Sequence, residues 1–362
     1  MKKVVCIHLL NNYSGSPLVL KQVIDVLMKN GREVDLYCSN TAGFLSETKA
    51  NRYSINYKKS KTKIGTLLGF LLSQLVLFNK LLKYRNQDVI FYINTIMPFG
   101  ASIIGKFMGK RIIYHIHETS VSPLILKHFL ICSIKLTSNH NIFVSKDLFS
   151  REQMNKIKST IIYNSLPSYF SQQTMEYQNK KDIGFNVLMI CSYKAYKGIY
   201  EFLKIALETA DYENINYTLI LDATRNEVDL FIKDNKIPLN MIILPSQNDV
   251  SPFYKKSSLL LNLSRVNKWV ETFGMTILEA MSFGIPVIVP PIGGPTEIVN
   301  DGIDGYCISS YEIESISKKI IELFEDAVLY KKLSQNAFTR SQDFSSVNFE
   351  AEILKIVNDD DL

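Results

Sequence analysis

Short apolar runs alternate with segments of helical periodicity along the whole chain, in two successive series. Runs of this length are typical of buried parallel strands, which need helical crossovers between them. The first series of predicted strands is VVCIHLL, EVDLYC, DVIFYIN, RIIYHIH, NIFVS and TIIYN, with helices at 17–29, 64–84, 98–108, 123–137 and 146–157. The second is FNVLMIC, YTLILD, NMIIL, LLLNLS and PVIVP, with helices at 198–210, 226–233, 273–283 and 311–324. The alternation predicts an α/β protein with two doubly wound parallel sheets.

Domain boundaries follow from the polar segment between the two series. At 362 residues the chain suits two domains. Residues 168–182 lack periodicity and are predicted to be a linker. The predicted organisation is a first domain at 1–167, the linker, a second domain at 183–344 and a final amphipathic helix within 345–362. Ligands of such sheets bind beyond the carboxyl ends of the strands, and two facing domains create a cleft there.

The composition excludes several other classes of protein. Five scattered cysteines without a C-x-x-C motif indicate neither a zinc site nor a disulfide framework, and they favour a reducing compartment. The amino-terminal apolar run contains His8 and lacks cleavage chemistry, so we predict a strand there rather than a signal peptide. The apolar run at 64–78 is interrupted by Ser73 and Gln74 and is shorter than a membrane span. We therefore expect a cytoplasmic protein.

Charge is divided unevenly along the chain. Residues 1–185 contain 25 Lys and Arg against 10 Asp and Glu, a net of +15, and the remainder contains 16 against 25, a net of −9. This asymmetry indicates either an anionic partner for the first half or a solvated basic surface. A lysine cluster before the predicted helix at 64–84 suits docking on an anionic bilayer. The alternative is a buried helix preceded by a basic loop; the cluster is Lys58, Lys59, Lys61 and Lys63.

Two glutamates lie eight positions apart in ETFGMTILEAMSFGIPVIVP. Glu271 falls in the loop before a helix that we expect to begin at Thr272 or Phe273. The backbone N–H groups at 273–275 would then be unpaired donors, and with the helix dipole they make a phosphate site. Glu279 lies within the helix, where its carboxylate suits the two hydroxyls of a ribose. The alternative is that Glu271 only favours the helix N-terminus and Glu279 pairs with a core Arg or Lys.

Two loops after predicted strands are also candidates for ligand contact. In CSYKAYKGIYEF, Lys194 and Lys197 follow a strand, where lysines suit a diphosphate, although most lysines are simply exposed. In VPPIGGPTEIV, Gly293 and Gly294 permit a close approach of the backbone to a ligand, or they form a plain turn.

The segment YHIHE ends a predicted strand of the first series. His115 and His117 point to one face of that strand, and Glu118 points to the other. Strand histidines are more often structural than catalytic, and His117, nearer the carboxyl end, is the better candidate.

Several motifs are absent from the sequence. There is no G-x-G-x-x-G, no Walker lysine loop and no G-x-S-x-G, and D-x-D occurs only in the acidic tail. A bound diphosphate would therefore be neutralised by lysine, arginine and backbone dipoles, without a metal.

The motifs occur in the order strand–KG–helix, ETFGMTILEAMSFGIPVI and GGPTEIVNDGIDGY. This order resembles the retaining GT-B glycosyltransferases of the large family 4 in the sequence-based classification. The likeness is strongest from Val187 to Tyr306, and in the amino-terminal half IHE, FVSKDL and IYNSLP match. The resemblance implies two Rossmann-like domains facing each other across a cleft. It also implies that the second domain holds most of a nucleotide-sugar donor and that the last helix crosses back onto the first domain.

The resemblance further implies roles for individual residues. Lys197 would bind the donor diphosphate, Glu271 would lie against the sugar hydroxyls, and His117 would approach the sugar from the first domain; these three form the candidate catalytic set. Glu279 would hold the ribose. The other donor-binding candidates are Lys194, Arg265, Thr272, Phe273, Gly274 and Met275, and the acceptor-side cleft candidates are Gly15, Ser16, Asn94 and Glu118.

Four positions depart from the family pattern. Ser192 stands where an arginine is usual, five residues before the KG lysine, so other cations would have to replace it. The usual E-G-F-G is E-T-F-G, and Thr272 would narrow the donor-sugar pocket or add a hydroxyl contact. The N-G that often ends the first domain is Asn164-Ser165, and the glycine pair of the first loop is reduced to Gly15.

The activity implied is transfer of a sugar, with retention, from a nucleotide-diphosphate sugar to a glycan or lipid-diphosphate-linked acceptor. We expect a uridine-diphosphate hexose as donor, no metal or other cofactor, and no nucleic-acid partner. The expected product is a bacterial surface polysaccharide such as O-antigen or capsule, made in the cytoplasm or at the inner face of the plasma membrane. The alternatives are a GT-B epimerase or phosphorylase, an oxidoreductase, which lacks its glycine fingerprint here, and a non-catalytic scaffold that keeps the fold.

Overall fold

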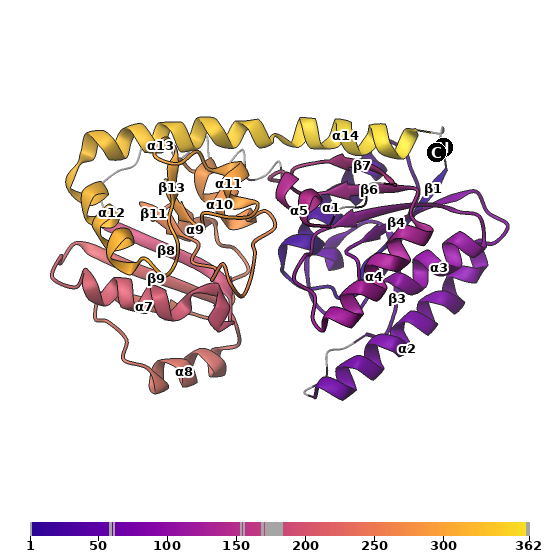
Figure 1. The fold of residues 1–362 in the computed structure, drawn as a ribbon, viewed down its shortest axis with the longest axis horizontal. Coiled ribbons are helices and arrows are strands. Elements are labelled where there is room, and N and C mark those ends of the chain that lie inside the picture. Colours follow the sequence, from indigo (N-terminus) through magenta and orange to yellow (C-terminus); the bar gives the residue numbers. More distant parts are fainter. Residues whose placement is uncertain are drawn as a thin grey trace. The chain divides into compact units, whose positions relative to one another are not determined.

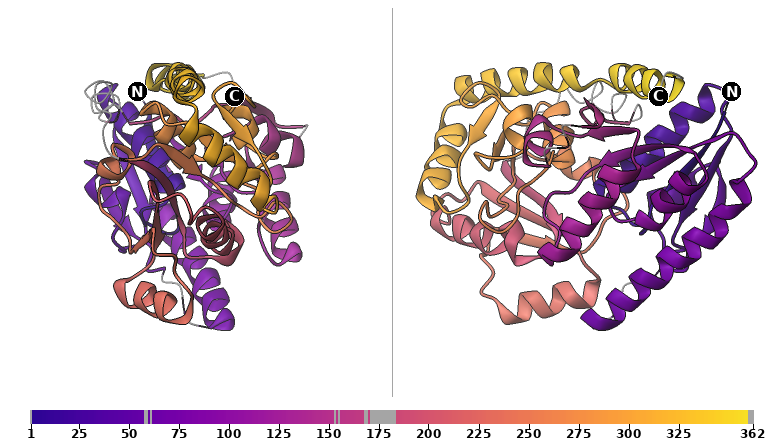
Figure 2. Two further views of the ribbon diagram at one scale, coloured as in Figure 1. Left: turned by 90° about the vertical axis from the view of Figure 1, so that its left-hand side faces the viewer. Right: turned by 45° about the vertical axis from the view of Figure 1, so that its right-hand side comes forward.

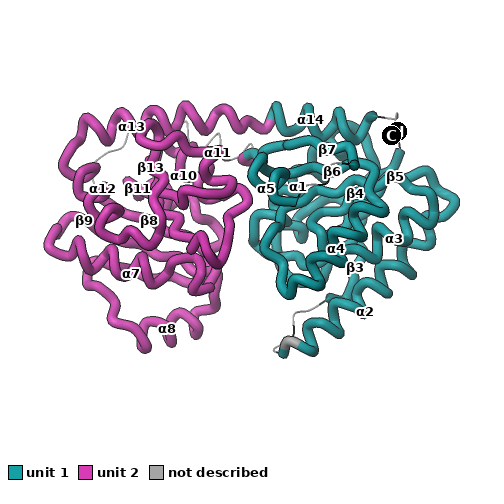
Figure 3. The backbone as a smooth tube through the Cα atoms, in the orientation of Figure 1, with its two compact units in different colours: residues 1–165, 347–362 teal, residues 166–346 magenta. Residues whose placement is uncertain are grey.

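The computed structural model describes residues 2–57, 60, 62–152, 154, 156–167, 170 and 184–359. The chain forms two compact units, unit 1 of Met1–Ser165 with Val347–Leu362 and unit 2 of Leu166–Ser346 (Figure 3). The predicted linker at 168–182 lies outside the described residues except for Phe170, as do Lys58, Lys59, Lys61 and the side chain of Lys63.

Unit 1 is built on a seven-stranded parallel sheet in the order β3-β2-β1-β4-β5-β6-β7 (Figure 1). β4 is buried along its whole length, as expected of a parallel sheet with helices on both faces (Figure 2). The edge strand β3 was not predicted, because Asn51 and Arg52 are exposed and polar rather than apolar. The strands are β1 (Lys3–Ile7), β2 (Val34–Cys38), β3 (Asn51–Ser54), β4 (Val89–Asn94), β5 (Arg111–Ile116), β6 (His140–Phe143) and β7 (Lys158–Ile161).

The helices of unit 1 include the last helix of the chain. Nη2 of Arg111 donates to the carbonyl O of Ile356 at 2.5 Å, and Nη2 of Arg32 donates to Oδ1 of Asn358 at 2.5 Å, so two arginines hold the C-terminal end of α14. The helices are α1 (Gly15–Lys29), α2 (Lys63–Leu81), α3 (Phe99–Phe107), α4 (Leu124–Thr137), α5 (Lys146–Glu152) and α14 (Ser346–Asn358), with the 3₁₀ turns η1 (Phe44–Glu47) and η2 (Leu82–Tyr84).

Helix α2 differs from the sequence-based expectation. Within the described part of the chain, the helical stretch Ile64–Tyr84 is the one that is long and apolar enough to cross a membrane, a test that core helices of soluble proteins also pass. The expectation that this run is too short was therefore wrong. The alternative of a buried helix holds for one side only: 28% of its apolar window is buried, and the outer side is exposed.

Unit 2 is built on a six-stranded parallel sheet in the order β10-β9-β8-β11-β12-β13. Its strands are β8 (Phe185–Ser192), β9 (Ile215–Asp222), β10 (Met241–Leu244), β11 (Leu259–Leu261), β12 (Val287–Val289) and β13 (Gly305–Cys307). Its helices are α7 (Ile199–Glu208), α8 (Arg225–Asp234), α9 (Ser251–Tyr254), α10 (Met275–Ser282), α11 (Pro295–Ile298), α12 (Ile313–Glu325) and α13 (Ala327–Ser341), with the turns η3 (Ala195–Lys197) and η4 (Gln342–Phe344).

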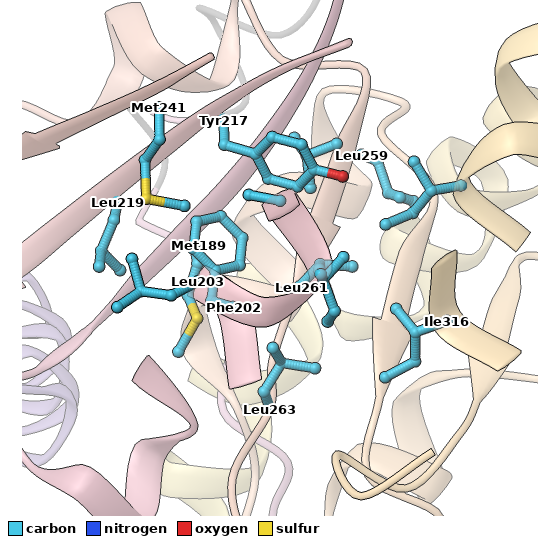
Figure 4. Close-up of a cluster of buried hydrophobic side chains, with 14 of the residues drawn as sticks. Met189, Phe202, Leu203, Tyr217, Leu219, Met241, Leu259, Leu261, Leu263 and Ile316 are labelled. Atoms are coloured by element: carbon cyan, nitrogen blue, oxygen red, sulfur yellow. The ribbon is translucent and has the colours of Figure 1, made fainter. Parts of the chain in front are cut away.

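The core of unit 2 lies where helices pack on the central strands. Met189 of β8, Leu219 of β9 and Phe202 of α7 are fully buried in one cluster (Figure 4). Tyr217 is buried in the same cluster, and its hydroxyl is satisfied by Oγ1 of Thr209 at 2.7 Å. This packing holds the carboxyl ends of β8 and β11 in register for the loops that follow them.

Candidate functional site

The carboxyl ends of the neighbouring strands β8 and β11 bring two distant parts of the sequence together. After β8 the chain forms η3, which ends at Lys197, and Gly198 then adopts a left-handed φ of 88°. A Cβ on Gly198 would lie 2.2 Å from the carbonyl O of Leu263, just beyond β11. Only glycine allows both this backbone conformation and this close approach. The glycine therefore sets Lys197 against the loop after β11.

Lys197 and Glu271 form an ion pair at this edge. Nζ of Lys197 lies 2.6 Å from Oε2 of Glu271, and the two side chains are 15% and 19% exposed. Nζ also lies 5.0 Å from the ring centroid of Trp269, on which Tyr196 stacks at 5.1 Å. Partial burial strengthens this pair relative to a surface pair, and an ammonium has three donors, so it can also bind a further anion. Sequence analysis missed both aromatic residues, although Trp269 is the only tryptophan in the chain.

The glycine pair after β12 supports the loop that carries Glu271. Gly293 has a φ of 87°, and a Cβ on it would lie 2.5 Å from the carbonyl O of Glu271. The N–H of Gly294 donates to that same carbonyl at 2.9 Å. A Cβ on Gly294 would lie 2.2 Å from the carbonyl O of Thr272. In the structure these glycines therefore pack against the Glu271 loop, which accounts for them without a ligand.

Helix α10 begins later than predicted, at Met275 rather than Thr272 or Phe273. Gly274 precedes it with a left-handed φ of 112°, which ends the loop, and Phe273 is buried with its ring 5.9 Å from that of Phe344. Among the described residues, none accepts a hydrogen bond from the N–H groups of Gly274 and Met275. These two groups, with the positive end of the helix dipole, can bind an anion.

Glu279 lies in α10 and is almost fully buried. The hydroxyl of Tyr254 donates to its Oε2 at 2.6 Å, and within the described chain this is the one hydrogen bond made to the carboxyl. The alternative that Glu279 pairs with an Arg or Lys is therefore wrong. Burial raises the pKa of Glu279, and the bond from Tyr254 partly offsets that rise.

The other predicted cations are not part of the Lys197 pair. Nε and Nη2 of Arg265 both lie 2.8 Å from Oε1 of Glu201 on α7, so this arginine is already engaged. Lys194 is exposed to solvent. Ser192, at the position where the family pattern has an arginine, ends β8 in register with Asp222.

The predicted residues of unit 1 lie at the carboxyl edge of its own sheet. Nδ2 of Asn94 donates to the carbonyl O of Ser16 at 3.0 Å, which turns its Oδ1 toward Nε2 of His117, 2.9 Å away. Because Oδ1 only accepts, Nε2 of His117 carries the proton. Gly15 is the first residue of α1, immediately before Ser16. The structure therefore connects Ser16, Asn94 and His117 in one hydrogen-bonded chain.

Burial keeps the histidines at this edge of the sheet uncharged. It lowers the pKa of His117 well below its usual value, and neighbouring His115, with its ring centroid 4.4 Å away, lowers it further. It also lowers the pKa of His115 to about 3 and of His8, which contacts Asn94, to about 4. These histidines are therefore neutral near pH 7.

Glu118 completes the edge of unit 1. Its Oε2 accepts from the backbone N–H of Ile96 at 3.3 Å, and burial raises the pKa of this carboxyl to about 7. Thr95, between β4 and Ile96, has a φ of 74°, a conformation that β-branched residues rarely adopt. Its N–H donates to the carbonyl O of His115 at 2.8 Å, which holds the strained residue in place.

Residues 171–340 match the sequence model of the family described as "Glycosyl transferases group 1". The matched stretch, just under half of the chain, contains Lys197, Glu271 and Glu279.

Two curated relatives are similar to parts of the chain. Poly(glycerol-phosphate) alpha-glucosyltransferase of Bacillus subtilis is 30% identical over 119 residues, which are 33% of this chain and 17% of that protein. An uncharacterized 41.2 kDa protein in the cps region of Klebsiella pneumoniae is 22% identical over 215 residues, which are 56% of this chain and 55% of that protein. The aligned parts thus span about half or less of these relatives.

A solved structure matches over nearly the whole chain. Anabaena Alr3699/HepE, in complex with UDP and glucose, superposes with a TM-score of 0.80 at 18% identity, covering 99% of this chain and 100% of that one. At this identity the likeness concerns the fold. The chain has the two Rossmann-like α/β domains of GT-B glycosyltransferase structures, which confirms the predicted fold class.

Proposed function

We propose that this chain is a retaining, metal-independent glycosyltransferase. Its donor is a uridine-diphosphate hexose. Its acceptor is a glycan or a lipid-linked glycan in the synthesis of a bacterial surface polysaccharide such as O-antigen or capsule. The observation that carries the proposal is the half-buried Lys197–Glu271 pair beside the open start of α10. The family match over residues 171–340 supports it.

Three similar proteins support the finer parts of the proposal. The Anabaena structure holds UDP and glucose, which favours a uridine nucleotide. The Bacillus relative is named as an alpha-glucosyltransferase of poly(glycerol-phosphate), which favours a polymer acceptor. The Klebsiella relative comes from a cps region, which favours a surface polysaccharide.

The proposed chemistry needs few side chains. The bond from the anomeric carbon to the leaving phosphate breaks, the acceptor oxygen bonds to that carbon on the same face, and the acceptor proton passes to the leaving phosphate. Lys197 and the N–H groups of Gly274 and Met275 stabilise the departing charge, while Glu271 accepts hydrogen bonds from the sugar hydroxyls. Loss of one such contact costs on the order of 10²–10³ in rate.

His117 and Glu279 have secondary roles in the proposal. His117, fixed through Nε2 by Asn94, hydrogen-bonds the donor sugar from unit 1. Glu279, held by Tyr254 through Oε2, holds the ribose with its other oxygen.

The first test is titration with UDP, GDP and ADP in EDTA, by calorimetry and by the fluorescence of Trp269, which lies beside Lys197. We expect selective binding of UDP to the wild type and its loss in Lys197→Ala. Lys204→Ala, an exposed lysine on α7, is the matched control. Binding of no nucleotide, or equal binding by Lys197→Ala, would contradict the proposed donor site. NMR of the product's anomeric configuration tests retention.

A non-catalytic binding protein is the second candidate. Ser192 in place of the usual arginine and the engagement of Arg265 with Glu201 favour it, because both reduce the positive charge available to a diphosphate. Nucleotide binding without donor hydrolysis or transfer would support this candidate over the enzyme.

A further inference from the structure

Unit 1 carries a large exposed apolar surface on three neighbouring helices. α2, α3 and α4 lie side by side on one face of the sheet (Figure 1). We name as the apolar face the exposed side chains of Leu68, Leu72 and Leu75 on α2, Phe107 on α3, and Ile125 and Phe129 on α4.

The exposure of these side chains follows the helical period. Leu68, Leu72 and Leu75 recur at spacings of four and three, so they form one stripe along α2. Leu72 and Leu75 are 61% and 62% exposed, and Phe107 and Ile125 are 80% and 79% exposed. Soluble monomers rarely expose so many large apolar side chains together, and such patches mark interaction sites.

Aromatic contacts join the three helices beneath this face. The ring of Phe99 on α3 lies 5.7 Å from that of Phe70 on α2 and 4.9 Å from that of Phe129 on α4. These contacts pack the three helices into one layer, whose outer side carries the apolar face.

The segment of the sequence that carries the apolar face is rich in positive charge. α2, α3 and α4 contain no Asp or Glu. Residues 48–146 contain 15 Lys and Arg but two acidic residues, Asp88 and Glu118. Lys106 on α3 and Lys135 on α4 are exposed, and each precedes in sequence an exposed apolar residue, Phe107 and Leu136. An apolar stripe flanked by cations matches the chemistry of an anionic lipid surface. A second copy of the same face would instead meet like charges.

The inner side of α2 is fixed to the rest of unit 1. Oε1 of Gln74 accepts from the N–H of Gly100 at 3.0 Å, and a Cβ on Gly100 would lie 2.6 Å from the carbonyl O of Gln74. Ser73 is buried as well, and its hydroxyl donates to the carbonyl O of Phe70 at 2.6 Å. Crossing a bilayer would break this packing, whereas lying flat on its surface would not.

We propose that the apolar face docks unit 1 on an anionic bilayer. α2 lies in the membrane plane, its leucines enter the boundary between headgroups and acyl chains, and Lys106 and Lys135 contact lipid phosphates. Docking of this kind would present the enzyme to a lipid-linked acceptor. The docking itself is independent of sugar transfer, so its test needs no nucleotide.

The test is co-sedimentation of the full chain with vesicles of phosphatidylglycerol and phosphatidylcholine, and with vesicles of phosphatidylcholine alone. We expect binding to the anionic vesicles that weakens with added salt. Leu72→Ser with Leu75→Ser should weaken it by about tenfold per leucine. Lys106→Glu with Lys135→Glu should weaken binding to the anionic vesicles mainly at low salt, because added salt already screens these charges.

Matched controls lie in unit 2. Leu230→Ser with Leu239→Ser changes two exposed leucines outside the apolar face, and Lys204→Glu with Lys233→Glu changes two exposed lysines. Both controls should bind like the wild type, and circular dichroism should show every variant folded.

Two outcomes would overturn the proposal. One is no difference between the anionic and the neutral vesicles. The other is a wild-type dimer in light scattering that the Leu72, Leu75 variant turns into a monomer, without vesicle binding, which would make the apolar face a self-interface.

Discussion

Replacing Gly198 by alanine tests how the candidate site around Lys197 is built. The change adds a Cβ to a residue whose φ is 88°, at 2.2 Å from the carbonyl O of Leu263. The left-handed backbone costs an L-residue about 1–2 kcal/mol. Relieving the clash requires Leu263 and η3 to move apart, which costs about a further 1–3 kcal/mol of stability. We therefore expect the free energy of unfolding of unit 2 to fall by about 2–5 kcal/mol, together with displacement of Lys197 and loss of nucleotide binding.

Gly302→Ala is the matched control for that prediction. Gly302 lies in the same unit with a φ of 73°, but a Cβ on it would meet nothing within 4 Å. The Gly302→Ala variant should therefore lose only the stability that the left-handed backbone costs, about 1–2 kcal/mol, and should still bind nucleotide. The difference between the two variants isolates the contact with Leu263.

Urea unfolding followed by the fluorescence of Trp269 measures unit 2 directly, because that residue is the only tryptophan. Circular dichroism follows both units, since a chain with two units need not unfold in one step. Equal losses of stability in Gly198→Ala and Gly302→Ala, or intact nucleotide binding in Gly198→Ala, would refute the argument that this glycine positions the lysine.

Three further variants probe individual contacts. Glu118→Gln removes a carboxyl whose pKa in the folded protein is about 7. Between about pH 4.5 and 7 this carboxyl keeps its proton in the folded state and loses it in the unfolded state, so the free energy of unfolding of the wild type should fall relative to that of Glu118→Gln as the pH rises. Parallel curves of stability against pH for the two proteins would contradict this. Tyr254→Phe removes the donor to the buried carboxyl of Glu279 and should cost about 1–3 kcal/mol in urea unfolding, whereas a neutral result would mean that the contact carries no stability. Glu271→Gln removes the carboxylate that pairs with Lys197, so calorimetry should show UDP binding about 3–10 times more tightly. The rate of sugar transfer should fall about 10²-fold, because the sugar hydroxyls lose their acceptor. Weaker UDP binding would show instead that Glu271 serves to position the lysine.

Most of the strands could be predicted because buried parallel strands are continuous apolar runs, as in VIFYIN of β4. The missed strands lack this signal. β3 lies at an edge with polar residues, and β13 has three residues, of which Gly305 is needed because a Cβ would lie 2.5 Å from the carbonyl O of Val287. Helix α13 was also missed, although its N-cap was readable: Asp326 accepts from the N–H groups of Val328 and Leu329.

The candidate site was harder to predict because its contacts are set by tertiary packing. Lys197 and Glu271 were each candidates, but their pairing joins residues 74 positions apart and depends on the register of β8 with β11. A phenolic partner for Glu279 was not foreseen, because Tyr254 comes from a separate short helix. The late start of α10 follows from the left-handed backbone of Gly274, which local propensity does not reveal.

The carboxyl edges of the two sheets differ in their electrostatics, and this difference bears on which ligand groups each edge can bind. In unit 2, Lys197 is largely buried and paired with Glu271, so an arriving diphosphate would meet a cation that is already partly desolvated and positioned. At the carboxyl edge of the sheet of unit 1, burial lowers the pKa of His8, His115 and His117 and holds them neutral, which suits hydrogen bonds to sugar hydroxyls better than binding of phosphate. Taken by itself, the sheet edge of unit 2 therefore suits phosphate, and the sheet edge of unit 1 suits polar, uncharged groups.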